Sequence, residues 1–104
     1  MREFVLRLGA AMQTVDIHAD IEARIVRLLD RLWRAADADS PDRPVFRAAG
    51  AELAAAYAAL SAGPDPRAAL PRLQRVRHLL SLVKDATPLA EAASAIVGTV
   101  AGPA

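Results

Sequence analysis

The 104-residue sequence contains no cysteine, one lysine and few aromatic residues, which make up 4% of the chain. Without cysteine, the fold has no disulfide bond, no cysteine-ligated zinc and no cysteine nucleophile. No stretch of about 18 uncharged apolar residues occurs, so the sequence predicts no membrane-spanning helix. Glu3 and Arg7 interrupt the N-terminal apolar run, which argues against a signal peptide and favours a cytoplasmic location.

Alanine and arginine are abundant instead, with 25 and 12 residues. Hydrophobic residues make up 54% of the chain and the net charge is +1, which is typical of a folded globular protein rather than a disordered segment. The length predicts a single helical domain over residues 1–104. The excess of arginine over lysine and the absence of asparagine are typical of a high-GC bacterium and carry no information about the fold.

Apolar residues recur three or four positions apart along most of the chain. Such stripes are the buried faces of amphipathic helices. They comprise Ile21, Ile25, Leu28, Leu32 and Ala36, widened by Leu29 and Trp33; Val45, Phe46, Ala49, Leu53, Ala56 or Tyr57, and Leu60; Leu73, Val76, Leu80 and Val83; and Leu89, Ala93, Ile96, Val97 and Val100. The sequence therefore predicts an all-α fold, a compact bundle of four or five helices.

Proline, glycine and short polar residues mark the expected breaks between these helices. The first break is expected in segment 37–44 and the second at Gly63, which proline follows. Asp65 and Thr87 each precede a proline, the pattern of an N-cap and a first helical residue. Pro71 comes so soon after the Asp65 cap that we expect a one-turn lead-in or a kink there.

The first twenty residues fit two structures. A β-hairpin over residues 3–19 is indicated by the alternation of Phe4, Leu6 and Leu8, then Val15, Ile17 and Ala19. A helix is indicated by the spacing of Phe4, Leu8, Met12 and Val15. We favour the helix because the rest of the chain offers no third strand. Asp16 or Asp20 is expected to cap the helix that contains residues 21–36.

Residues that could carry catalysis or bind a metal are sparse. The histidines, His18 and His78, are sixty positions apart, and Asp16 and Asp20 lie near the first of them. A metal site normally needs three or four ligands, so we expect both histidines to be solvated. The sequence has no nucleophile elbow, no glycine-rich phosphate loop and no recognisable acid–base pair. We therefore expect no enzymatic activity, no cofactor and no bound metal.

A basic segment runs from Arg67 to Lys84 without an acidic residue. At about 100° per residue, Arg75 and Arg77 fall on either side of the apolar stripe rather than on one face. This placement favours neighbouring acidic side chains or the acidic rim of a partner protein over nucleic acid, for which no aromatic residue interleaves the charges. The candidate basic rim consists of Arg72, Arg75, Arg77 and Lys84.

Small residues repeat every four positions near the C-terminus. Such a row allows two helix backbones to approach closely, and bulky apolar residues lie beside it. Two interpretations stay open: packing within the chain, and a surface for a partner or a second copy. The candidate protein interface consists of Ala90, Ser94, Ile96, Val97, Gly98 and Gly102.

The stretch from Pro66 to Ala93, PRAALPRLQRVRHLLSLVKDATPLAEAA, combines an Arg/Leu-rich helix, a short break and an Ala-rich helix. In this pattern the chain, over residues 64–101, resembles small helical effector-associated modules of actinobacterial conflict and signalling proteins. The resemblance implies a non-catalytic adaptor that brings proteins together. We expect a non-enzymatic protein-interaction module that self-associates or docks a partner through its C-terminal helices. A small nucleic-acid-binding or antitoxin-like regulator is the alternative.

Overall fold

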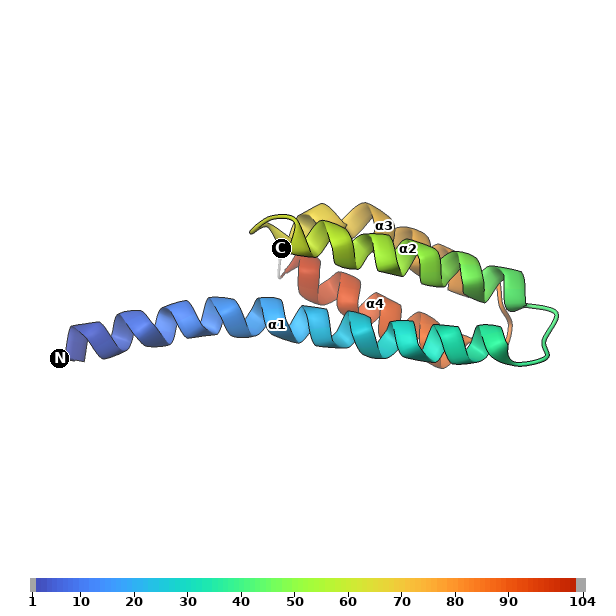
Figure 1. Cartoon of the computed structure of the whole chain (residues 1–104), viewed down its shortest axis with the longest axis horizontal. Coiled ribbons are helices and arrows are strands. Elements are labelled where there is room, and N and C mark those ends of the chain that lie inside the picture. Colours follow the sequence, from blue (N-terminus) through green and yellow to red (C-terminus); the bar gives the residue numbers. More distant parts are fainter. Residues whose placement is uncertain (1, 103–104) are drawn as a thin grey trace.

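The computed structural model of the chain describes the backbone of residues 2–102 and the side chains of residues 18–102. It contains four α-helices and one short 3₁₀ helix: α1 (Arg2–Asp37), α2 (Arg43–Ser61), η1 (Pro66–Ala69), α3 (Leu70–Ser81) and α4 (Thr87–Ala101). No strand occurs over residues 2–102, and the predicted all-α bundle is confirmed (Figure 1).

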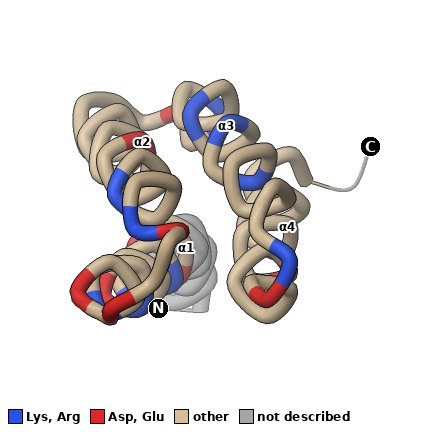
Figure 2. Tube along the Cα trace, turned by 90° about the vertical axis from the view of Figure 1, so that its right-hand side faces the viewer, with Lys and Arg blue, Asp and Glu red and all other residues tan. Residues whose placement is uncertain are grey.

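The four α-helices lie side by side along one long axis (Figure 1). α2 packs against both α1 and α3, and α4 completes the bundle by packing against α3 and α1. Seen end-on, α1 and α2 form one side of the bundle, and α3 and α4 form the other (Figure 2). Each helix therefore has an inner face for the core and an outer face for solvent.

The predicted apolar stripes supply the core, except for Trp33 and Tyr57, which lie at the edges of their stripes and are exposed. The largest fully buried side chains all come from them: Ile21, Ile25, Leu28, Leu32, Leu53, Leu60, Leu73, Val76 and Leu80. Among the described residues, no buried side chain is polar or charged. Burial of aliphatic groups therefore stabilises the bundle, at about 1.5–3 kcal/mol for each large side chain.

α1 is one continuous helix. Residues 3–19 are helical, as we favoured, and they form no β-hairpin. The predicted N-cap at Asp16 or Asp20 is wrong, because the helix passes through both positions. Asp20 instead accepts a hydrogen bond from Nε of Arg24, one turn later, at 2.9 Å.

The first two breaks follow the expected signals. α1 ends at Asp37, and Arg43 folds back so that its Nε donates a hydrogen bond to the carbonyl of Ala36 at 2.9 Å. Oδ1 of Asp65 accepts a hydrogen bond from the backbone N–H of Arg67 at 3.0 Å, which lowers the pKa of the Asp65 carboxyl. The 3₁₀ helix that Asp65 caps is the one-turn lead-in expected ahead of α3.

The start of α4 differs from the expected one, and its end does not. Thr87 is not its N-cap: the helix begins at Thr87 itself, Ala86 precedes it, and no side chain bonds the free N–H groups there. At the other end, Gly102 adopts a φ of +73°, in the left-handed region that favours glycine. Its N–H donates to the carbonyl of Gly98 at 3.1 Å, so α4 continues past Gly98 and ends at Ala101.

Leu80 tests the assignment of the core, because its side chain is fully buried on α3. Replacing Leu80 by alanine should lower the free energy of unfolding by about 2–5 kcal/mol, through lost burial and the cavity left behind. Urea denaturation followed by far-UV circular dichroism measures this change. Gln74→Ala, on the exposed side of the same helix, is the control and should cost less than about 0.5 kcal/mol. If the two variants lowered the free energy of unfolding equally, the face of α3 assigned to the core would be wrong.

Gly50 allows the indole of Trp33 to lie against the backbone of α2. A Cβ atom at position 50 would lie 2.8 Å from both Cη2 and Cζ3 of Trp33, closer than packed carbon atoms approach. Any side chain at position 50 therefore displaces the ring. Trp33 is nevertheless 41% exposed, so one face of the indole covers α2 while the other faces solvent.

We expect Gly50→Ala to shift the fluorescence emission of Trp33, the only tryptophan, and to bring no gain in stability. Alanine is about 1 kcal/mol better than glycine in a helix, but displacing the indole offsets that gain. Gly98→Ala is the matched control, because a Cβ there meets nothing within 4 Å. It should stabilise the protein by about 0.5–1 kcal/mol with unchanged emission. Equal stabilisation by both variants would contradict the contact between Trp33 and Gly50.

Candidate functional site

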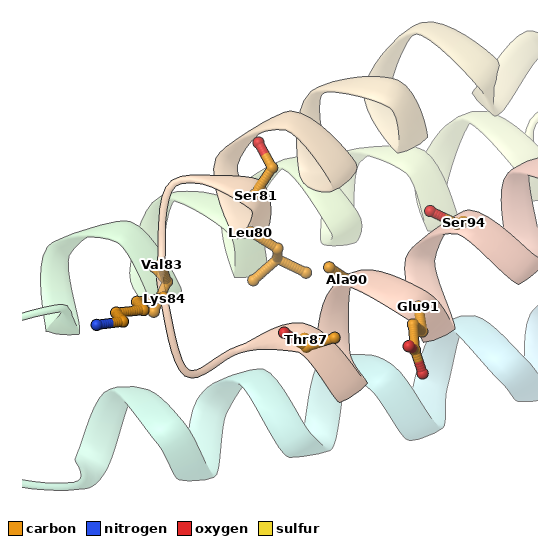
Figure 3. A pocket seen from close by; sticks show the side chains of 8 residues that line it. All are labelled: Leu80, Ser81, Val83, Lys84, Thr87, Ala90, Glu91 and Ser94. Atoms are coloured by element: carbon orange, nitrogen blue, oxygen red, sulfur yellow. The ribbon is translucent and has the colours of Figure 1, made fainter.

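A groove lies on the outer side of the bundle where α3 ends and α4 begins (Figure 3). We call it the α3–α4 groove. It encloses about 380 Å³ and is open to solvent. The lining residues are Leu80, Ser81, Val83, Lys84, Thr87, Ala90, Glu91 and Ser94.

The floor of the α3–α4 groove is apolar. Leu80 and Val83 are buried, and Ala90 is half-buried. Figure 3 shows Leu80 of α3 and Ala90 of α4 directed into the space between the two helices. Thr87, Ala90 and Ser94, which are small, form the α4 side of the groove together with Glu91. The floor of the groove therefore offers apolar contacts.

The rim of the groove carries charges and hydroxyl groups. Lys84, in the loop that follows α3, and Glu91, one turn into α4, are both exposed and have opposite charges. Ser81, Thr87 and Ser94 add exposed hydroxyl groups. Such a rim can orient a bound segment by hydrogen bonds and by opposite charges while the floor takes up its apolar part.

Leu82 is an exposed apolar residue next in sequence to two residues that line the groove, Ser81 and Val83. It is 63% exposed, more than any other large hydrophobic residue among those described. Leu82 was not among the predicted site residues because it lies outside the stripe of Leu80 and Val83. A leucine out of phase with a helical stripe was the available signal. Glu91, Thr87 and Ser81 of the rim carried no comparable signal.

The candidate protein interface divides between the groove, the core and open solvent. Ala90 and Ser94 line the α3–α4 groove. Ile96 and Val97 are only 2% and 8% exposed and belong to the core, so they are not available to a partner. Within the chain, no helix approaches Gly98, since a Cβ there would meet nothing within 4 Å. The row of small residues is therefore not a close contact within the described bundle, and Gly102 serves as the end of α4.

The candidate basic rim is divided as well. Nη1 of Arg72 lies 3.0 Å from Oε2 of Glu52, and Nη1 of Arg75 lies 3.7 Å from Oε1 of the same carboxylate on α2. An acidic neighbour was expected for this helix, and Glu52 provides it. Arg77 is exposed on another side of α3, and Lys84 lies in the groove rim. The four cations therefore form no single positive face.

His18 lies 3.4 Å through its Nε2 from Oε1 of Glu22, one turn later on α1. Glu22 was missed as its neighbour, although the spacing of four residues was the signal for it. His78 is exposed at the end of α3. Over the described residues, no three histidine or carboxylate side chains gather where they could hold a metal ion.

No family model, curated protein or solved structure matches the chain. The likeness of residues 64–101 to effector-associated modules therefore stays a prediction. Within the described part of the chain, no helix combines the length and apolar character needed to cross a bilayer.

The ion pairs of Glu52 are exposed, which predicts a small effect on stability. Arg72→Gln should change the free energy of unfolding by no more than about 1 kcal/mol, and less in high salt, because solvent screens the pair. Arg77→Gln, which removes the same charge elsewhere on α3, is the control for net charge. Urea denaturation at low and high salt measures both. A salt-independent loss well above 1 kcal/mol for Arg72→Gln would show that the pair is desolvated.

Proposed function

We propose that this protein is a non-enzymatic interaction module that docks a protein partner at the α3–α4 groove. The observation that carries the proposal is the apolar floor of an open groove, formed by Leu80, Val83 and Ala90. The exposed Leu82, next in sequence to the lining residues Ser81 and Val83, adds apolar surface that loses contact with water only when another molecule covers it.

The groove also indicates the chemistry of the partner segment. Its volume of about 380 Å³ accommodates one or two apolar side chains. Lys84 and Glu91 favour a segment that carries an acidic and a basic residue on either side of its apolar anchor. An amphipathic helix has this composition, with anchors one turn apart.

The arrangement of the arginines supports a protein partner over a nucleic acid. A nucleic-acid surface requires several cations on one face, free to contact successive phosphates. Glu52 pairs with Arg72 and Arg75, which reduces the positive charge of α3 on that side. The role of an antitoxin-like regulator has no such support. Adaptor function and a cytoplasmic location are part of this proposal.

Affinity capture with variants of the groove tests the proposal. The full chain is used as bait in a lysate of its own cells, and captured proteins are identified by mass spectrometry. Ser94→Arg places a bulky charged side chain in the groove, and Leu82→Lys replaces the exposed leucine next in sequence to its lining residues, so both should reduce capture of the partner at least tenfold. Each variant must retain the wild-type helical content.

Ala48→Arg, an equally exposed change on α2, is the control and should leave capture unchanged. Reduction by both groove variants and not by Ala48→Arg supports docking at the groove. A partner that is captured equally by all four baits binds elsewhere, and that result would overturn the proposal.

A further inference from the structure

Arg77 adds a second cation beside the α3–α4 groove. It precedes Ser81, a lining residue, by one turn of α3, so the two side chains lie on the same side of that helix. Arg72 and Arg75, which pair with Glu52, lie on the other side of α3, toward α2. Arg77 is exposed and forms no ion pair with any side chain that the structure describes. Its charge is therefore available to a molecule docked in the groove.

The two cations of the groove lie at its opposite ends. α3 and α4 are antiparallel neighbours (Figure 1). One turn back along α3 from Ser81 therefore leads toward Ser94, whereas Lys84 lies in the loop at the other end of the groove (Figure 3). Arg77 and Lys84 are seven positions apart, and so are Thr87 and Ser94 on the α4 side, which corresponds to about 10 Å of helical rise. The α3 side of the groove thus carries a positive charge at each end.

Glu91 gives the α4 side of the groove a negative charge. It lies between Thr87 and Ser94 and is exposed. Neither Glu91 nor Lys84 pairs with a side chain in the described part of the protein. Asp85, next to Lys84 in the loop, is exposed as well but does not line the groove. The apolar floor therefore lies between two positive charges on the α3 side and one negative charge on the α4 side.

A helix is the secondary structure that suits an occupant of this groove. Over residues 2–102 the structure contains no strand, so an extended segment finds no sheet edge to which its backbone could bond. A helix satisfies its own backbone N–H and C=O groups. Two turns of helix match the length of the groove, and residues seven positions apart then lie on the same side of that helix.

We propose, on the basis of docking at the α3–α4 groove, that the partner segment is an acidic amphipathic helix of another protein. Two acidic residues seven positions apart contact Arg77 and Lys84, and an apolar residue midway between them covers the floor. A basic residue on the opposite edge of the same helix contacts Glu91. These contacts fix which edge of the helix meets α3, and a helix with the opposite charges is rejected by repulsion.

Selection of peptides by the full chain tests the acidic helix. The probe is a displayed library of amphipathic helical peptides of about 14 residues, or four turns, with one face randomised. The wild-type chain should enrich peptides that carry Asp or Glu at two positions seven apart, with a large apolar residue between them. Arg77→Glu/Lys84→Glu should enrich Lys or Arg at the same two positions. Arg27→Glu/Arg31→Glu makes the same change of charge at exposed positions of α1 and should leave the enriched pattern unchanged.

The affinity of the most enriched peptide gives the size of the effect. Fluorescence anisotropy should show a dissociation constant at least about tenfold higher for Arg77→Glu/Lys84→Glu than for the wild type. High salt should reduce this difference, because it screens the ion pairs. Replacing both acids of the peptide by lysine should weaken binding to the wild type and restore binding to the double variant. A change in the fold of the variant alone would not produce this rescue.

Each contrary outcome identifies what is wrong. If the wild type enriches basic peptides, or apolar peptides without a preference for charge, the acidic helix is wrong while docking at the groove stands. If the selected peptides bind Ser94→Arg as tightly as the wild type, or if no sequence is enriched, both proposals are wrong. Labelled duplex DNA is a second probe: binding of DNA that Arg77→Glu/Lys84→Glu abolishes would assign the two cations to phosphate groups and overturn the acidic helix.

Discussion

Close approach of α2 to α1 and α3 is the constraint on which the other contacts depend. Half of the buried residues of α2 are alanine or glycine: Ala49, Gly50 and Ala56. The distance between packed helices is set by the side chains at the contact, so these positions bring α1 and α3 close to α2. That approach places Trp33 on the backbone of α2 and brings Arg72 within 3.0 Å of Glu52. The same approach fixes the position of α3 against α2. The position of α4 then depends on α3 and α1, against which it packs.

The elements of the fold follow from local sequence signals, and the contacts between them do not. Helical periodicity and prolines predicted the four stripes and their breaks, because both act within one or two turns. The cap at Asp65 was predicted for the same reason, since its partner is two residues away. Thr87 offered the same signal and failed, because a cap also depends on the backbone conformation ahead of the helix, which the fold decides.

In the candidate site, too, local patterns identified residues but not the contacts between helices. The sequence pointed to Ala90, Ser94 and Lys84, and the structure brings them into one groove. It also grouped Ile96 and Val97 with the small-residue row, although they project inward from α4. The apolar stripe of α4 had already assigned both residues to the core, whereas spacing does not say whether the small residues beside them contact another helix. The pairing of Trp33 with Gly50 joins residues 17 positions apart on two helices, and no local pattern indicates it.

Large exposed apolar residues depart from the core stripes on two pairs of helices. The bundle itself does not require them at these positions, because buried residues of the stripes supply its core. Leu82 is such a residue on the α3–α4 side, and Val26, Trp33 and Tyr57 are such residues on the α1–α2 side. Figure 2 shows α1 and α2 on one side of the bundle and α3 and α4 on the other, so the two sets come from opposite pairs of helices. A partner docked at the α3–α4 groove, as proposed, would not cover Val26, Trp33 and Tyr57, which belong to the other pair of helices.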